Sequence, residues 1–263
     1  MEVIIQPTYT QLIAVSAEII RSALLKKPNL VLGLATGSTP VGLYKALARM
    51  HKTEGLDFSA VTTFNLDEYV GIPPSHPYSY HTFMETHFFN AVNIPAGNRH
   101  IPQSTAVAHE EFCEQYEAAI VNAGGIDIQV LGIGKDGHIG FNEPSSSLGS
   151  RTRIKTLTQS TLEANAPHFG GAVDAVPKMA ITMGVGTIME AKQCLLLANG
   201  ESKAGAIAHA VEGSITAEVP ASVLQMHPRT VVIIDEEAAS QLKRIDYYKQ
   251  VYANKQELLS EGY

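Results

Sequence analysis

The stretch at residues 126–144, IDIQVLGIGKDGHIGFNEP, is an apolar, β-branched run followed by a cluster of glycines. Such a run leading into a glycine-rich turn is typical of a buried strand that ends in a loop. In open α/β sheets, ligands bind at the carboxyl ends of the strands. The loop carries Asp136, His138 and Glu143, and an imidazole with two nearby carboxylates is suited to proton transfer. We therefore expect this loop to form part of an active site.

The same order of strand, turn and helix recurs on both sides of this stretch. Strands are predicted at residues 29–35, 61–66, 126–131, 151–158, 194–198 and 230–235. Helices are predicted at residues 10–26, 41–50, 78–90, 110–121, 202–212 and 236–252. This alternation, with continuous apolar runs in the strands, predicts the α/β class: a doubly wound, mostly parallel, Rossmann-like sheet flanked by helices.

The chain shows no repeat and no clean boundary, so we expect a single domain spanning residues 1–263. Residues 159–177 contain glycines and prolines without a clear period. Long connections of this kind often cover active sites. The sequence therefore predicts a mobile lid at about residues 157–177.

Composition and charge argue against several classes of protein. The formal net charge is −7 and no Lys/Arg-rich run is present, which disfavours nucleic-acid binding. The N-terminus lacks the basic and apolar regions of a signal peptide, and no apolar run approaches the roughly 18 residues of a membrane span. Cys113 and Cys194 lack metal-ligand spacing and are expected to be reduced structural thiols. The sequence predicts a soluble, cytoplasmic protein.

The turn after the 29–35 run reads TGSTP and covers Thr36–Pro40. Gly37 permits close backbone approach. Ser38 or Thr39 can cap the following helix, whose first turn would hold Pro40. The free N–H groups and the dipole of such a helix attract an anion. The turn matches neither the P-loop nor the dinucleotide fingerprint. A small phosphate monoester therefore fits better than a nucleotide, although a plain capped turn has the same pattern.

Two further candidates follow other predicted strands. Asp67 comes directly after the 61–66 run, where it is either a general base or a turn-capping residue. Lys203 opens the helix after the 194–198 run. It either binds the anion at Thr36–Pro40 or is a solvated surface lysine. The two positions are at strand ends, where a ligand site of an α/β sheet is expected.

Five motifs, FNLDEYVG, GIGKDGHIGFNEP, SSSLGSRTRIKTLT, MGVGT and LQMHP, are distributed over nearly the whole chain. Together they make the sequence similar to the glucosamine-6-phosphate deaminase family. The resemblance implies conversion of D-glucosamine 6-phosphate and water to D-fructose 6-phosphate and ammonia, without a redox cofactor or a catalytic metal. A metal at His138 is also disfavoured by its surroundings, because no second histidine nearby has ligand spacing.

The resemblance assigns roles to the catalytic candidates. Asp67 matches the base that removes the proton from carbon 2 and returns it at carbon 1. His138 matches the residue that opens the sugar ring. Asp136 and Glu143 match the carboxylates that orient this histidine. The phosphate-binding set of the family matches Thr36, Gly37, Ser38, Thr39 and Lys203.

The same resemblance implies an allosteric site and an oligomer. Positions that bind the activator N-acetylglucosamine 6-phosphate in hexameric relatives match Ser146, Arg153, Lys155 and Thr156. Arg153 and Lys155 alternate along the 151–158 strand, so exposed bases are expected on one of its faces. The long tail after Asp235 is similar to that of the oligomeric relatives, which predicts a homo-hexamer.

The lid departs from the pattern of some relatives, which carry an arginine there that closes over the substrate phosphate. The matching stretch reads ANAPHFGG, with Pro167 and His168 and no arginine. Either His168 takes the place of the arginine, or phosphate binding depends more on Lys203 and the turn at residues 36–39.

Two other functions belong to proteins of similar fold. A 6-phosphogluconolactonase hydrolyses a lactone and needs no base at carbon 2, so the FNLDEYVG and GHIGFNEP motifs favour the deaminase. A sugar-phosphate-sensing domain of a transcription regulator would follow a DNA-binding segment. Only about one helix precedes the 29–35 strand and the net charge is negative, which disfavours the regulator.

Overall fold

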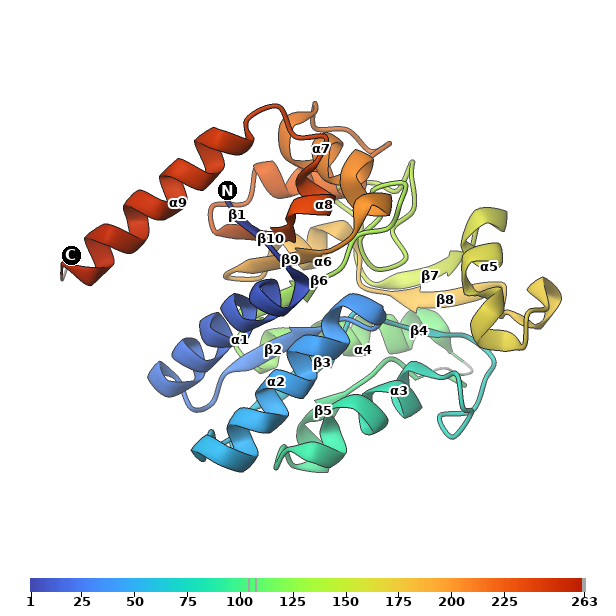
Figure 1. The fold of residues 1–263 in the computed structure, drawn as a ribbon. Helices are drawn as coiled ribbons and strands as arrows, with labels where there is room; N and C mark the ends of the chain where they lie inside the picture. The colour runs from blue at the N-terminus through green and yellow to red at the C-terminus, as the bar shows by residue number, and fades with distance from the viewer. Residues whose placement is uncertain (104, 107, 262–263) are drawn as a thin grey trace.

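A seven-stranded parallel sheet forms the centre of the structure (Figure 1). The computed structural model describes residues 1–103, 105–106 and 108–261, apart from the side chain of His168. The strands are β1 (Glu2–Gln6), β2 (Val31–Leu34), β3 (Thr62–Asn65), β5 (Arg99–His100), β6 (Ile128–Leu131), β9 (Cys194–Ala198) and β10 (Thr230–Asp235). Their order across the sheet is β1-β10-β9-β6-β2-β3-β5, and neighbouring strands run parallel. The predicted α/β architecture is confirmed.

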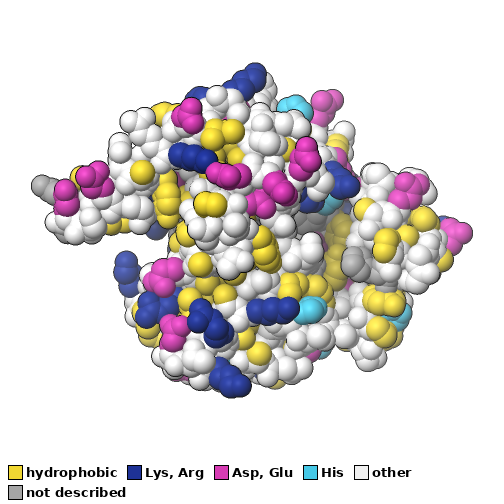
Figure 2. Space-filling model, viewed as in Figure 1, with side chains coloured by type: hydrophobic (Ala, Val, Ile, Leu, Met, Phe, Trp, Pro, Cys, Tyr) yellow, Lys and Arg dark blue, Asp and Glu magenta, His cyan; other side chains and the backbone are white. Residues whose placement is uncertain are grey.

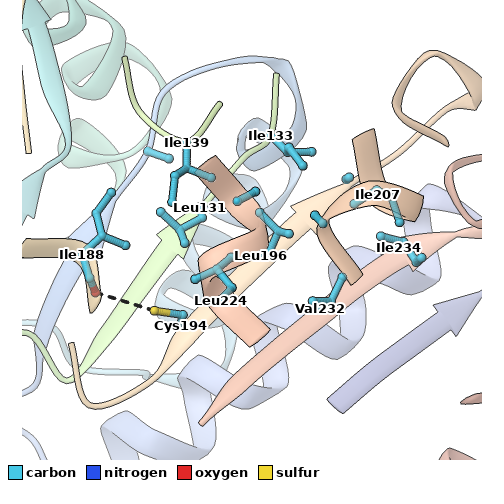
Figure 3. Packing of buried hydrophobic residues seen from close by; sticks show 14 of the residues in the cluster. Leu131, Ile133, Ile139, Ile188, Cys194, Leu196, Ile207, Leu224, Val232 and Ile234 are labelled. Atoms are coloured by element: carbon cyan, nitrogen blue, oxygen red, sulfur yellow. Dashed lines mark hydrogen bonds between the residues drawn. The ribbon is translucent and has the colours of Figure 1, made fainter. Parts of the chain in front are cut away.

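Helices cover both faces of this sheet, which explains why its central strands are apolar throughout. The helices are α1 (Tyr9–Lys26), α2 (Ser38–Glu54), α3 (Tyr80–His87), α4 (His109–Asn122), α6 (Val185–Met189), α7 (Ala204–Glu212), α8 (Glu236–Ala239) and α9 (Ile245–Ser260). The first three pack on one face, and α4, α6, α7 and α8 pack on the other. Figure 3 shows the second core, where Leu131, Leu196 and Val232 share one register row across three strands.

The strand order reverses direction between β2 and β6. From β2 the chain adds β3 and β5 on one side, whereas from β6 it adds β9 and β10 on the other side. Connections that diverge in this way leave a crevice outside the carboxyl ends of the two central strands. The turn at residues 36–39 follows β2 and the loop with His138 follows β6, so both predicted site segments border this crevice.

A second, antiparallel sheet was not expected from the sequence. It contains β4 (Asp67–Tyr69), β8 (Met179–Thr182) and β7 (Arg153–Thr156) in the order β4-β8-β7. With α5 (Gln159–Asn165) it forms the lobe on the right of Figure 1. These strands have three or four residues each, and they pair segments far apart in the chain. The strand predicted at residues 151–158 corresponds to β7, whereas β4 and β8 are too short for their sequence pattern to predict them.

The predicted lid at residues 157–177 has more regular structure than its sequence suggests. It contains α5 and two short 3-10 helices, Ala166–Phe169 and Val173–Ala175. Thr158 caps α5 by accepting a hydrogen bond from the backbone N–H of Thr161. Leu162 and Phe169 belong to a small buried cluster with Tyr69 of β4. The expectation of a segment without periodic structure was wrong, while the movement of the lid and the single-domain organisation stay predictions.

The terminal helix predicted at residues 236–252 is two helices, α8 and α9. The break between them is held from another part of the chain, because the Glu212 carboxylate accepts the backbone N–H groups of Lys243 and Arg244. Helical periodicity cannot reveal such a tertiary contact. The edge strand β1 was also missed. In the described residues, no helix has the length and apolarity needed to cross a membrane.

Candidate active site

The loop after β6 places His138 and Asp136 together. The backbone N–H of His138 donates to Asp136 Oδ1 over 3.2 Å, and this oxygen lies 2.6 Å from His138 Nδ1. The Nδ1 contact is within ion-pair distance but its direction is poor for a hydrogen bond. A side chain at Gly134 would begin 2.2 Å from the imidazole, so the ring packs directly on this glycine.

Asp136 is stabilised as an anion. Partial burial acts to raise its pKa, but the contacts with His138 outweigh burial and hold the pKa of Asp136 below its usual range. An ionised Asp136 favours a proton on the nitrogen that faces it, which leaves the other ring nitrogen of His138 to exchange a proton with a ligand. The predicted pairing of these two residues agrees with the geometry.

Asp67 lies two residues beyond β3 and begins β4, where it pairs with Thr182 of β8. It is 6% exposed. Burial, followed by the neighbouring charge of Glu68, raises the pKa of Asp67 to about 8. Within the described part of the chain, no hydrogen-bond donor contacts its carboxylate. Among the described residues, no hydrogen bond therefore offsets the free-energy cost of burying the Asp67 anion. Asp67 is consequently a strong base whenever it is ionised.

Gly140 brings the His138 loop against Asp67. Its φ is +57°, and a side chain there would begin 3.4 Å from Asp67 Oδ2 and 2.9 Å from Thr182 Oγ1. The loop backbone thus passes close to the buried carboxylate. The two predicted catalytic segments, which come from different strands, meet at this point.

Aromatic side chains lie around Asp67. The Tyr69 ring packs 5.0 Å from that of Tyr80, centroid to centroid. Tyr44 donates to the Ala35 carbonyl over 2.6 Å. Burial raises the pKa of all three tyrosines, and the charge of Asp67 adds to this effect. The three tyrosine hydroxyls therefore remain neutral. The side chains around Asp67 thus supply no positive charge that would stabilise its carboxylate anion.

Glu68 is a buried structural carboxylate that the sequence did not reveal. It is 1% exposed and accepts three backbone N–H groups, those of Tyr69, Tyr80 and His81, at 2.9–3.0 Å. Two of these belong to the first turn of α3, a position that favours a carboxylate. Burial still raises the pKa of Glu68 against the effect of the three donors.

Glu143 contacts the lid in this structure. It is 2% exposed and accepts hydrogen bonds from Thr158 Oγ1 over 2.9 Å and from Thr161 Oγ1. The backbone N–H of Thr158 also donates to both carboxylate oxygens at 3.1 Å. The expectation that Glu143 orients His138 does not describe this arrangement, because the first turn of α5 offers free donors to the carboxylate.

The predicted phosphate turn lies at the N-terminus of α2. Gly37, with φ +118°, is the residue that caps the helix, and no side chain caps it. The expectation that Ser38 or Thr39 caps α2 was therefore wrong. Thr39 Oγ1 instead donates to Asn199 Oδ1 over 2.7 Å, which ties the turn to the end of β9. Because the first turn of α2 has no acidic residue, its N–H groups remain suited to an anion.

Lys203 joins the same end of the sheet. It ends the short helix Glu201–Lys203 after β9, and its Nζ donates to the Ile133 carbonyl over 2.7 Å. This contact spans from the end of β9 to the loop after β6. The ends of β2, β6 and β9 thus bring Thr36, Gly37, Ser38, Thr39 and Lys203 to one edge.

Of the bases on residues 151–158, Arg151 is exposed, whereas Arg153 and Lys155 are partly buried. Arg153 donates to Asn142 Oδ1 over 2.9 Å. Arg151 binds Glu117 and Glu190. Ser146 is buried, and its hydroxyl has no partner among the described residues, whereas Thr156 is exposed on β7.

The remaining candidates concern metals, thiols and the lid histidine. Among the described residues, no group of three or more His, Cys, Asp or Glu side chains could hold a metal ion. Cys113 and Cys194 are buried free thiols, and Cys194 Sγ contacts the Ile188 carbonyl (Figure 3). The prediction for His168 concerns a side chain outside the described part of the structure.

Comparisons with known proteins match this geometry. Residues 6–233 match the family model described as glucosamine-6-phosphate isomerases/6-phosphogluconolactonase. The chain is 53% identical over 240 residues to a glucosamine-6-phosphate deaminase of Thermoanaerobacter pseudethanolicus, covering 91% of this chain and 94% of the relative. It is 51% identical over 248 residues to glucosamine-6-phosphate deaminase 2 of Bacillus subtilis, covering 94% and 100%.

Solved structures agree with the sequence matches. A monomeric glucosamine-6-phosphate deaminase superposes with a TM-score of 0.89 at 46% identity, covering 92% of this chain and 100% of that one. A 6-phosphogluconolactonase from Trypanosoma cruzi has a TM-score of 0.74 at 20% identity over 92% and 97% of the two chains, which shows a shared fold alone. The chain therefore belongs to the glucosamine-6-phosphate isomerase and 6-phosphogluconolactonase family, among the glucosamine-6-phosphate deaminases.

Proposed function

We propose that this protein is an enzyme of amino-sugar metabolism that converts D-glucosamine 6-phosphate and water to D-fructose 6-phosphate and ammonia. The named deaminases that are about half identical over nearly the full chain support this activity. The observation that carries the chemistry is the buried carboxylate of Asp67 beside the loop of His138. A lactonase hydrolyses an ester bond and removes no proton from carbon 2.

His138 is proposed to open the sugar ring. Ring opening moves a proton from the anomeric hydroxyl to the ring oxygen, and imidazole exchanges protons near neutral pH. Asp136, 2.6 Å from Nδ1 of His138, fixes the orientation and tautomer of the ring. The open chain that results exposes carbon 2 to a base.

Asp67 is proposed to move the proton from carbon 2 to carbon 1. With a pKa raised to about 8, it is mostly neutral in the free protein at pH 7. The substrate amine is a cation when protonated, and an adjacent cation favours the ionised form of a carboxylate. Substrate binding would therefore generate the base. Since the carboxylate is almost inaccessible to water, the proton it removes is retained for carbon 1.

The phosphate group is proposed to bind at the N-terminus of α2, with Lys203 as its cation. Helix N–H groups and the Thr36–Thr39 hydroxyls supply donors, and Lys203 supplies charge. Glu143 holds the first turn of the lid in the described arrangement. Its proposed action on His138 requires its side chain to leave that turn.

The finer predictions on partners stay open to test. The similar solved deaminase is described as monomeric, so it lends no support to a homo-hexamer or to activation by N-acetylglucosamine 6-phosphate at Ser146, Arg153, Lys155 and Thr156. The solution mass, measured with and without this ligand, tests both.

The activity itself is tested by incubating the protein separately with glucosamine 6-phosphate and with 6-phosphogluconolactone. Stoichiometric release of ammonia and fructose 6-phosphate from the first substrate is expected. Hydrolysis of the lactone without ammonia release from the amino sugar would overturn the proposal in favour of the lactonase.

A further inference from the structure

Two lysines lie close together at the phosphate end of the site. Lys203 is anchored to the loop after β6 through its hydrogen bond to Ile133, only two residues before Lys135. Burial lowers the pKa of Lys203, and repulsion from Lys135 lowers it further, while Asp136 acts in the opposite direction. Like charges repel at short range unless an anion separates them. The loop after β6 and the end of β9 thus each bring one lysine to the same end of the sheet.

Lys135 differs from the paired lysines of this protein. Lys27 and Lys192 both bind Asp127, and Lys249 binds Glu236. Lys135 is exposed, and within the described ranges no carboxylate lies at ion-pair distance from it. Its neighbour Asp136 is engaged by His138. The ammonium of Lys135 is thus available to a ligand.

A phosphate monoester carries a charge of about −1.5 to −2 at pH 7. Lys203 supplies one positive charge, and the N-terminus of α2 adds a partial one of about +0.5. The lid segment at residues 157–177 contains no lysine or arginine. Apart from His168, the proposed elements of the crevice therefore leave the anion incompletely balanced.

We propose that Lys135 is a second phosphate-binding lysine, which contacts the substrate phosphate from the loop after β6 while Lys203 contacts it from the end of β9. This assignment rests on the proposed function, because it takes a phosphosugar as the ligand. Figure 2 shows a hollow between the main body and the lobe on the right, with a basic side chain and a histidine at its upper edge.

Because Lys135 is separated from His138 by two residues, phosphate binding there also constrains the loop that holds the ring-opening histidine. The phosphate end of the substrate and the ring-opening group are thus connected through one short, glycine-containing segment. Because the phosphate takes no part in the reaction, a contact with Lys135 should affect mainly the affinity for phosphorylated ligands.

The test compares Lys135→Gln with Lys52→Gln. Lys52 is also exposed, but it lies near the other end of α2, roughly 20 Å from the first turn at 1.5 Å per residue. Binding of inorganic phosphate and of fructose 6-phosphate is measured by calorimetry. We expect Lys135→Gln to weaken the binding of both ligands by about tenfold, because one charge-assisted contact is lost. KM for the substrate should rise by a similar factor, and kcat should stay within about twofold of wild type. Lys52→Gln should change neither.

A second readout reports the lysine pair without any ligand. The pKa of Lys203, followed by NMR of its side chain, should rise in Lys135→Gln because a repelling charge is removed. Phosphate affinity within twofold of wild type, or no phosphate binding by the wild-type protein, would overturn the proposal. Failure of the deaminase reaction alone would not, because phosphate binding is measured without turnover.

Discussion

Asp67 and Asp136 are two carboxylates of one site in opposite surroundings. Asp136 lies on a half-exposed loop in contact with His138, and its pKa is held low. Asp67 lies at the junction between the two sheets, nearly inaccessible and surrounded by neutral tyrosines, and its pKa is raised to about 8. In the proposed mechanism, this difference lets one fold supply a permanent anion that orients a histidine and a latent base that acts on carbon.

Asp67→Asn removes the latent base and should have the largest effect. We expect kcat to fall by roughly 10³-fold or more, at the upper end of general-base effects, while substrate still binds. Transfer of deuterium from carbon 2 of labelled substrate to carbon 1 of the product, followed by NMR, should stop. Transfer at the wild-type rate would remove Asp67 from this role.

The stability of Asp67→Asn serves as a control, because it shows whether a loss of activity reflects misfolding. In the wild type, the folded pKa of Asp67 lies far above the unfolded value of about 3.9. Folding is therefore favoured while Asp67 is protonated, and stability declines as the pH rises from about 4 to 8. The asparagine side chain does not titrate, so the variant should be at least as stable as wild type at pH 8. A large loss of stability there would show that the activity loss reflects misfolding.

His138→Gln tests the other half of the comparison. Without a ring nitrogen that exchanges protons, ring opening should slow by about 10²-fold. The loss should be much smaller with an open-chain analogue of the substrate, because the isomerisation at Asp67 remains. Equal losses with both substrates would contradict the ring-opening role.

Glu68→Gln should bring the two aspartates closer in pKa. The charge of Glu68 raises the pKa of Asp67, so its removal lowers that pKa. The rise of kcat/KM with pH, which reports ionisation of Asp67 in the free enzyme, should therefore move to lower pH. A glutamine also gives up an acceptor for the N-terminus of α3, at a cost of about 1–3 kcal/mol. An unchanged pH profile would argue against coupling between Glu68 and Asp67.

Thr158→Val concerns a third carboxylate, Glu143, and should have the smallest effect. It removes the hydroxyl that caps α5 and donates to Glu143, with an expected loss of about 1 kcal/mol. Urea unfolding measures it. Ser160→Ala, on the same turn, is the matched control and should change little. Equal losses in both variants would mean that the Glu143 contact contributes nothing specific.

Much of the fold was predictable because the central strands are buried on both faces. The strands predicted at 194–198 and 230–235 match β9 and β10 residue for residue. The placement of Asp67 and His138 at one end of the sheet was also predictable, because both lie in segments that follow such strands. In the small antiparallel sheet, the strand predicted at 151–158 corresponds to β7, but β4, β8 and their pairing were not predictable, since the strands are short and pair across distant segments.

Partners of buried carboxylates were the least predictable part of the site. Glu68 follows Asp67 in a motif where either residue could face solvent, and only the position of α3 makes it buried. Glu143 lies five residues beyond His138, yet it contacts the lid. These outcomes depend on which backbone donors the tertiary structure brings near, and residue spacing does not report that.

Gly140 places a bare peptide backbone against the Asp67 carboxylate. The space that a methyl group would occupy there borders Asp67 and Thr182, where a substrate carbon must approach the base. The absence of a side chain at Gly140 thus leaves space beside the Asp67 carboxylate. An alanine at this position would occupy that space and compete with the substrate for it.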